Sequence, residues 1–325
     1  MESLNPHDIT LKNGETTHYY EGGSKDGTPL IFLHGWPDIS ETWKHQLSKF
    51  SATPTYRVIA PDMRGYGGSS APKAKEAYRL QVLVEELVDF AKQVGVTKAV
   101  WIGHDWGCGV TSALAAHYPE LCIGLANLSV PYRSLELGLD FLTTMVNRDI
   151  YPKDEYEWGQ WEYMRYYELH PEETVKTFEG SLETITKILY ANSDPTQGWW
   201  FGGHPENLPD IPIESTVIDQ ELFSHLIDSH KKHGFFPPTA YYLNHPANVE
   251  YAKSEKNGGV LEFPVLFIDA KYDSVCSPST APKMAESQKA FAKNLTYVTV
   301  EAGHWLHLER PEETNGALER WLKTL

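Results

Sequence analysis

Short apolar segments alternate with segments of helical periodicity along the first 130 residues and again after residue 264. The apolar segments lack polar alternation and are rich in branched side chains, which predicts strands buried on both faces of a parallel sheet. They cover residues 29–33, 56–60, 98–102, 122–130, 265–268 and 295–300. Before them, residues 9–11 and 17–20 flank an Asn-Gly pair and predict a hairpin.

Helical segments follow most of the predicted strands, with apolar residues recurring on one face of each. They cover residues 41–50, 80–94, 281–291 and 311–325, and a further helix begins after Gly107 and ends near Pro119. Strands that alternate with helices in this way are typical of a doubly wound α/β fold.

The rhythm changes between residues 131 and 245, where strand patterns stop and aromatic residues become frequent. Helical segments are predicted at residues 156–169, 171–191 and 214–232, and the aromatic residues include Trp199, Trp200 and Phe201. We expect this region to form a helical cap over the strand ends. The predicted division is a core of residues 1–131 and 246–325 with an inserted cap of residues 132–245.

One predicted strand ends abruptly in the sequence Gly103-His104-Asp105-Trp106-Gly107. Helical spacing follows at once, so Asp105 lies at the apex of a strand–turn–helix unit, and the flanking glycines permit a tight turn. This is the layout of a nucleophile elbow, in which serine is usual. Here the apex residue is Asp, and the chain contains no Gly-x-Ser-x-Gly. The alternative is that Asp105 only caps the helix that follows.

Composition limits the classes of protein to consider. The net charge of −16 argues against nucleic-acid binding, because such proteins present a basic surface to the phosphates. Three cysteines are too few for a disulfide framework and favour a reducing compartment. The N-terminus has no signal-peptide pattern, and no apolar run is long enough to span a bilayer. We therefore expect a cytoplasmic protein that does not bind membranes.

Three polar residues follow predicted strands, namely Asp105, Asp273 and His304. The carboxyl ends of parallel strands lie at one edge of a sheet, so these residues are expected to meet there. Their chain order of nucleophile, acid and histidine is the one that α/β-hydrolases show. Asp269 is the alternative acid, but it belongs to the strand itself. His307 is the alternative histidine, but the turn out of the last strand directly precedes His304.

The chain resembles the epoxide hydrolases of the α/β-hydrolase fold, in their soluble single-domain form. The matching motifs are His34-Gly35-Trp36-Pro37, Asp62-Met63-Arg64-Gly65-Tyr66-Gly67, Gly103-His104-Asp105-Trp106-Gly107, Ala270-Lys271-Tyr272-Asp273 and Gly303-His304-Trp305. The resemblance implies a mostly parallel, eight-stranded sheet with an inserted helical cap. Because the first motif begins at residue 34, we expect no N-terminal phosphatase domain like that of the mammalian soluble enzymes.

The resemblance also implies two cap tyrosines that hydrogen-bond the epoxide oxygen. The best matching positions are Tyr163 and Tyr242. Tyr166 or Tyr167 could replace the first, and Tyr241 could replace the second.

The chemistry of an epoxide suits these residues. A carboxylate is already ionised at neutral pH, so Asp105 could attack an epoxide carbon without a base. A water activated by His304, itself oriented by Asp273, would then hydrolyse the resulting ester to a vicinal diol. The backbone N–H groups of Trp36 and Trp106 are expected to bind the oxyanion.

The expected reactants are a small apolar epoxide and water, with neither a cofactor nor a metal ion, in a monomer or a dimer. The expected pocket residues are Phe32, Trp36, Trp106, Tyr163 and Tyr242.

Two other functions stay open. A haloalkane dehalogenase would use the same Asp, His and acid, and the indole of Trp106 would suit a halide. The tyrosine pair argues against it, as does Trp36, which stands where an asparagine is more usual. The second alternative is a non-catalytic α/β-hydrolase that only binds an apolar ligand, and the complete triad argues against that.

Overall fold

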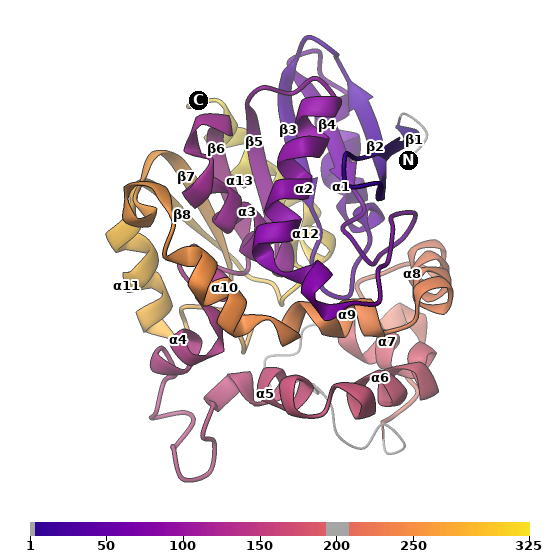
Figure 1. The fold of residues 1–325 in the computed structure, drawn as a ribbon, viewed down its shortest axis with the longest axis vertical. Coiled ribbons are helices and arrows are strands. Elements are labelled where there is room, and N and C mark those ends of the chain that lie inside the picture. Colours follow the sequence, from indigo (N-terminus) through magenta and orange to yellow (C-terminus); the bar gives the residue numbers. More distant parts are fainter. Residues whose placement is uncertain (1–3, 193–207) are drawn as a thin grey trace.

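A single sheet lies at the centre of the computed structural model, which describes residues 4–192 and 208–325 (Figure 1). Among these residues the sheet has eight strands in the order β1-β2-β4-β3-β5-β6-β7-β8. β2 pairs antiparallel with β1 and with β4, and the remaining neighbours are parallel. The strands are β1 (Asn5–Thr10), β2 (Thr16–Gly23), β3 (Thr28–Leu33), β4 (Tyr56–Pro61), β5 (Ala99–His104), β6 (Cys122–Leu128), β7 (Leu261–Ala270) and β8 (Ala292–Val300).

The predicted strands and the hairpin are confirmed, with ends that shift by a few residues. In the hairpin Thr10 is paired with Thr16, and the turn between them contains Gly14 in the left-handed region at φ 86°. The predicted fold class, a mostly parallel α/β sheet, is therefore correct.

Helices cover both faces of the sheet. They are α1 (Lys44–Ser51), α2 (Leu80–Gln93), α3 (Trp106–His117), α11 (Pro282–Phe291), α12 (Leu306–Glu309) and α13 (Pro311–Leu322). Alternate residues of a strand point to opposite faces. On β3, Ile31 and Leu33 pack in the core cluster that includes α2 and α3, whereas Leu30 and Phe32 pack in the cluster that includes α1 and α13. Burial on both faces explains why the strands are apolar without alternation.

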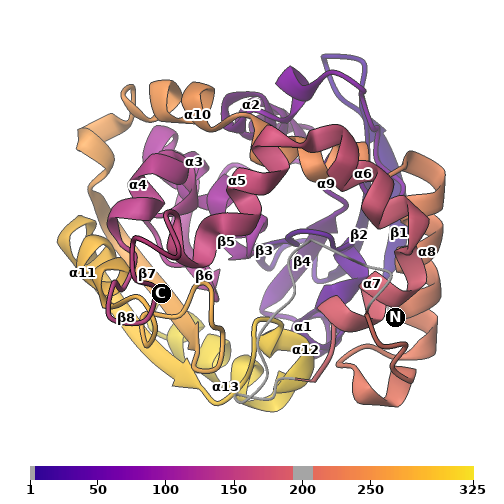
Figure 2. The ribbon, with the colours of Figure 1, turned by 90° about the horizontal axis from the view of Figure 1, so that it is seen from below.

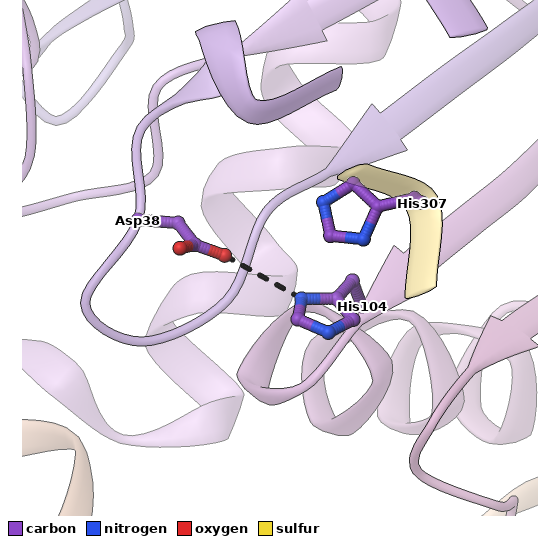
Figure 3. A group of neighbouring side chains, drawn as sticks. All are labelled: Asp38, His104 and His307. Carbon is purple, nitrogen blue, oxygen red and sulfur yellow. Dashed lines mark ion pairs between the residues drawn. The ribbon is translucent and has the colours of Figure 1, made fainter. Parts of the chain in front are cut away.

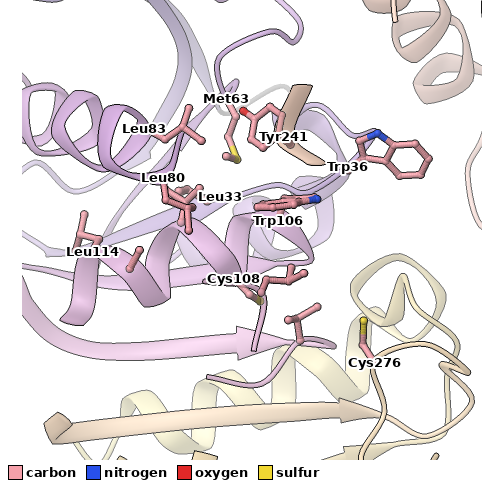
Figure 4. Packing of buried hydrophobic residues seen from close by; sticks show 14 of the residues in the cluster. Leu33, Trp36, Met63, Leu80, Leu83, Trp106, Cys108, Leu114, Tyr241 and Cys276 are labelled. Carbon is pink, nitrogen blue, oxygen red and sulfur yellow. The ribbon is translucent and has the colours of Figure 1, made fainter. Parts of the chain in front are cut away.

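Figure 4 shows part of the first of these clusters. Leu80, Leu83 and Leu114 pack around α2 and α3, and Trp106 stands at the start of α3 close to Tyr241. The cluster is continuous from the sheet to the region where the strands of the core end, so the aromatic side chains there are held by the same packing that stabilises the fold.

Seven α-helices lie among the described residues between β6 and β7, as expected for the cap. They are α4 (Gly138–Thr144), α5 (Glu162–Leu169), α6 (Pro171–Gly180), α7 (Leu182–Leu189), α8 (Gln220–His233), α9 (Phe236–Ala240) and α10 (His245–Ala252). In Figure 1, α5, α6 and α7 form a layer below the sheet, and Figure 2 shows them from beneath, in front of β3 and β5. The cap boundary at residues 132–245 stays a prediction.

Two details of the predicted cap were wrong. The helix expected at residues 171–191 is divided into α6 and α7 at Ser181, whose φ of −137° is not helical and which follows Gly180. The helix expected from residue 214 begins at Gln220, because the carboxylate of Asp219 accepts a hydrogen bond from the Leu222 N–H and caps it there. Trp199, Trp200 and Phe201 lie outside the described residues.

Contacts between charged side chains join α8 to the core. Asp219 is paired with Lys44, and Nδ1 of His225 lies 2.7 Å from Oε2 of Glu41.

Within the described residues, we find no helix that is both long enough and apolar enough to cross a membrane.

Glycine lets the turn after β5 approach β3 closely. A Cβ atom at Gly107 would lie 2.2 Å from the carbonyl oxygen of Leu33, a distance at which the backbone must shift. The same Cβ at Gly109, two residues further along α3, would meet its nearest atoms at 3.4 Å, in ordinary contact.

These distances predict opposite effects for two alanine substitutions in one helix. Gly107→Ala should lower the free energy of unfolding by more than about 2 kcal/mol, because the elbow must move away from β3. Gly109→Ala should change it by less than about 1 kcal/mol, towards stabilisation, since alanine favours a helix. Urea denaturation of both variants measures the difference. Equal destabilisation by the two would contradict the close approach of the elbow and β3.

Candidate active site

Asp105 stands at the apex of the turn between β5 and α3. Its φ of 51° lies in the left-handed region, which costs a non-glycine residue about 1–3 kcal/mol and is found at functional sites. Its side chain makes no capping hydrogen bond to α3. Instead Oδ1 accepts a hydrogen bond of 2.7 Å from the backbone N–H of Trp36. The alternative of a mere helix cap therefore does not describe this carboxylate.

His304 lies between two carboxylates. Its Nδ1 is 2.6 Å from Oδ2 of Asp273, and its Nε2 is 3.6 Å from Oδ2 of Asp105. The other oxygen of Asp273 accepts hydrogen bonds from the N–H groups of Val275 and Cys276, at 2.9 and 3.0 Å. The structure thus brings together the nucleophile, histidine and acid predicted from the sequence.

The two alternative residues lie elsewhere. Asp269 accepts hydrogen bonds from Ser277 Oγ and Tyr297 OH, both 2.8 Å long, within the sheet. The ring of His307 packs behind the triad, with its centroid 4.6 Å from that of Trp43.

The charges of the triad shift its pKa values. Burial alone would lower the pKa of His304, but the carboxylates of Asp273 and Asp105 outweigh it and raise that pKa to about 10. Burial alone would raise the pKa of Asp273, but His304 and the two backbone N–H groups hold it below its usual value. In this state the triad is an imidazolium ion between two carboxylates.

A cavity opens directly beside Asp105 and His304. It is lined by Trp36, Asp105, Tyr163, Tyr242, Val275, Cys276, His304 and Trp305. A separate cavity near α2 is lined by Arg64 and Glu86 among others, but their side chains already pair with each other at 2.8 Å. We take the cavity beside the triad as the candidate active site.

Two tyrosines line this cavity together with Asp105. Tyr163 comes from α5 and Tyr242 from the 3-10 turn η8 (Tyr241–Leu243), and their ring centroids are 5.9 Å apart. Tyr242 also contacts the rings of Trp36 and Trp106 edge-on, at 5.8 and 5.2 Å. Burial raises the pKa of both hydroxyls well above the usual value, so that they keep their protons at neutral pH.

The alternative tyrosines have other surroundings. The hydroxyl of Tyr241 donates a 2.8 Å hydrogen bond to the carbonyl of Arg64. Tyr166 packs on the ring of His170, and Tyr167 packs between the rings of Trp36 and Phe178. The structure therefore places the two tyrosines predicted from the resemblance, and not their neighbours, along the cavity.

Phe32 was expected in the pocket and is placed elsewhere. It is fully buried on the opposite face of the sheet, with its ring 5.3 Å from that of Trp43 and 6.4 Å from that of Phe50. The reason is the strand alternation of β3, which turns Phe32 towards α1. The loop that follows β3 carries Trp36 to the cavity instead.

Val275, Cys276 and Trp305 line the cavity but were missed by the sequence analysis. The available signal was their position, since each lies within three residues of Asp273 or His304 along the chain.

Among the described residues, two groups of three side chains have the donor atoms to hold a metal ion. One is Asp273, Cys276 and His304, whose acid and histidine are already joined at 2.6 Å. The other consists of Asp38, His104 and His307.

The geometry predicts which aspartate controls the histidine. Asp273→Asn removes the carboxylate that contacts Nδ1, so burial should prevail and the pKa of His304 should fall by more than 2 units, roughly the shift expected for loss of a buried charge partner. Asp269→Asn should leave that pKa unchanged, because Asp269 bonds Ser277 and Tyr297 instead. Histidine NMR titration of both variants measures it. A comparable fall in the Asp269 variant would contradict the assignment.

Comparisons with known proteins agree with this architecture. A family model described as alpha/beta hydrolase fold matches residues 28–161. The mouse (Mus musculus) protein Bifunctional epoxide hydrolase 2 is 29% identical over 332 residues, covering 98% of this chain and 56% of that protein. Epoxide hydrolase A of Mycobacterium tuberculosis is 29% identical, with 96% of each chain covered.

Among solved structures, an epoxide hydrolase mutant from Vigna radiata matches with a TM-score of 0.82 and 26% sequence identity, over the full length of both chains. The chain spans about half the length of the mouse, pig (Sus scrofa) and rat (Rattus norvegicus) proteins named Bifunctional epoxide hydrolase 2. These comparisons confirm the α/β-hydrolase fold and relate the chain to epoxide hydrolases.

Proposed function

We propose that this chain, an α/β-hydrolase-fold relative of the epoxide hydrolases, converts epoxides and water to vicinal diols through an ester on Asp105. The observation that carries the proposal is a carboxylate, in place of a serine, that lies beside a histidine and lines one cavity with two tyrosines. Asp105 supplies the nucleophile, and Tyr163 and Tyr242 supply donors for the oxygen that leaves. The aromatic lining suits a small apolar substrate.

The hydrogen bond from Trp36 distinguishes the two oxygens of Asp105. Oδ1 is held by the Trp36 N–H at 2.7 Å, whereas Oδ2 lies on the side of His304. We infer that Oδ2 attacks the epoxide carbon, because Oδ1 then becomes the carbonyl oxygen of the ester with a donor already in place. The C–O bond of the ring breaks, and the leaving oxygen takes a proton from one of the two tyrosines.

The ester changes the electrostatics of the triad. Two carboxylates raise the pKa of His304 to about 10, and esterification removes the charge of one of them. The pKa of His304 should therefore fall, while the tyrosine left as phenolate is buried and holds a proton strongly. The proton passes from His304 to the tyrosine, which leaves a neutral imidazole ready to act as a base.

Hydrolysis restores the starting state. The neutral His304 takes a proton from a water, which attacks the ester carbonyl carbon of Asp105. The oxyanion forms on Oδ1, opposite the Trp36 N–H, and the Trp106 N–H at the start of α3 is the second proposed donor. The bond between the carbonyl carbon and Oδ2 then breaks, and Oδ2 leaves in the diol with the second proton of the water. The oxygen of the water takes its place in the carboxylate, and the triad returns to the imidazolium between two carboxylates. Water is the only co-reactant, so the balance needs no cofactor.

Haloalkane dehalogenation is the alternative that the same aspartate and histidine would support. A halide leaves without a proton, so that reaction gives the paired tyrosines no task.

Three buried free cysteines fit a reducing compartment, and we propose a cytoplasmic location.

Blocking the second step should trap the ester. His304→Gln should lower steady-state turnover of styrene oxide by about 10³-fold or more, because no base remains for the water. Intact mass spectrometry should then show the protein increased by the mass of one epoxide, with the adduct on Asp105. Asp105→Asn, mixed in the same way, should show no adduct. Absence of any adduct on the His304 variant, together with chloride release from a chloroalkane by the wild type, would favour the dehalogenase.

Two adjacent tyrosines provide a matched pair for the first step. Tyr242→Phe should slow the single-turnover rate of adduct formation by about 10²-fold, because the leaving oxygen loses a donor, and Tyr163→Phe should act similarly. Tyr241→Phe should keep that rate and lose about 1 kcal/mol of stability, since it removes only the hydrogen bond to Arg64. Stopped-flow tryptophan fluorescence reports the step through Trp36 and Trp106. If the Tyr241 variant were the slower one, the assignment of Tyr242 would be wrong.

A further inference from the structure

Behind the triad, away from the cavity, three ligand-type side chains converge. Asp38 belongs to the loop after β3, His104 is the last residue of β5 and His307 lies on α12. All three are fully buried, and one donor atom from each lies within 4.8 Å of the other two. Figure 3 shows the Asp38 carboxylate directed at the ring of His104, with the ring of His307 alongside.

These side chains carry polar atoms that the rest of the described chain does not satisfy. Oδ2 of Asp38, Nδ1 of His104 and both ring nitrogens of His307 have no hydrogen-bond partner among the described residues. Oδ2 of Asp38 and Nδ1 of His104 are only 3.4 Å apart. Buried polar atoms in folded proteins are nearly always satisfied, so a cluster of four requires an explanation.

The outer contacts fix which atoms face the cluster. Nε2 of His104 lies 2.9 Å from the backbone carbonyl of His304, which can only accept, so Nε2 carries the proton. In a neutral ring, Nδ1 then presents a lone pair towards the carboxylate of Asp38. The other oxygen of Asp38 accepts hydrogen bonds from Tyr190 OH and Trp305 Nε1. Two acceptors at this distance repel unless a positive charge lies between them, which either a proton on Nδ1 or a bound cation supplies. A proton there would still leave both ring nitrogens of His307 without a partner among the described residues.

We propose that Asp38, His104 and His307 form a binding site for a divalent transition-metal ion of the zinc type. A tetrahedral ion with bonds of about 2.0–2.2 Å holds its ligands roughly 3.4 Å apart, which is the observed separation of the first two. Two imidazoles and a carboxylate are a zinc donor set, whereas calcium and magnesium prefer oxygen alone. Metal-binding histidines commonly donate their outer N–H to a carbonyl, as His104 does.

The ion would connect the three segments that carry the candidate active site. Asp38 is two residues after Trp36, His104 directly precedes Asp105, and His307 is three residues after His304. None of the three proposed ligands is among the residues that line the cavity. The role is therefore structural, and the proposal does not depend on the reaction. It departs from the expectation of no metal, because the ligands come from distant segments with no recognisable spacing.

Metal analysis of the purified full-length chain tests the site. After exposure to Zn²⁺ and removal of free metal, the wild type should retain about one equivalent by elemental mass spectrometry. His307→Gln and Asp38→Asn should retain less than a tenth of that. His245→Gln is the matched control, because His245 is also buried with both ring nitrogens unsatisfied by the described residues but belongs to no such group. It should bind zinc like the wild type.

Thermal unfolding and a cysteine variant complete the test. Removal of zinc by a chelator should lower the Tm of the wild type by several degrees, and it should not change the Tm of the His307 variant. This comparison requires only that the variant folds, and it does not require activity. Cys276→Ala should keep the metal, since Cys276 belongs to the triad group. The proposal is overturned if the wild type retains no zinc, if His307→Gln and His307→Asn both retain it, or if Cys276→Ala loses it.

Discussion

The placement of one imidazole between two carboxylates is the constraint on which the candidate site depends. His304 contacts Asp273 at 2.6 Å and Asp105 at 3.6 Å, and both carboxylates are buried. A buried charge is tolerated only when it is paired and hydrogen-bonded, so each member of the triad requires the others. Asp273 meets this need with two backbone N–H groups and the imidazole. Asp105 meets it with the Trp36 N–H and the same imidazole.

The sheet supplies this arrangement through the approach of its loops. The elbow after β5 lies against the end of β3 because Gly107 leaves room for the Leu33 carbonyl. Gly35 does the same on the other side, since a Cβ there would lie 2.4 Å from Cβ of Asp105. The hydrogen bond from Trp36 therefore depends on two glycines, Gly35 in the loop after β3 and Gly107 in the first turn of α3. The left-handed φ of Asp105 is held by this packing, and the stability of the surrounding core outweighs its cost.

The fold and the triad could be predicted from the sequence because each depends on local pattern. Apolar runs marked the strands, and Asp105, Asp273 and His304 each follow one. Phe32 was misplaced because a continuous apolar strand does not reveal which residue faces which side. The choice of Tyr242 over Tyr241 came from the resemblance alone. The two residues are adjacent in a 3-10 turn, so their side chains point in different directions, and the sequence pattern does not predict which of them lines the cavity. The group of Asp38, His104 and His307 was invisible because only tertiary packing joins its three segments.

A nucleophilic aspartate needs its two side-chain oxygens to be distinguished, a requirement that a serine does not have. A serine has one side-chain oxygen, which attacks and is released again when the acyl-enzyme is hydrolysed, and the carbonyl that receives the water belongs to the substrate. In the proposed reaction Asp105 brings its own carbonyl, so its two oxygens must have different roles. The Trp36 N–H holds Oδ1 before any substrate is bound, and His304 faces Oδ2. In the proposed reaction, the N–H that holds the resting carboxylate would also bind the oxyanion, so one hydrogen bond would serve both the ground state and the second step. Its benefit to the rate of that reaction would come only from the additional charge that develops on Oδ1.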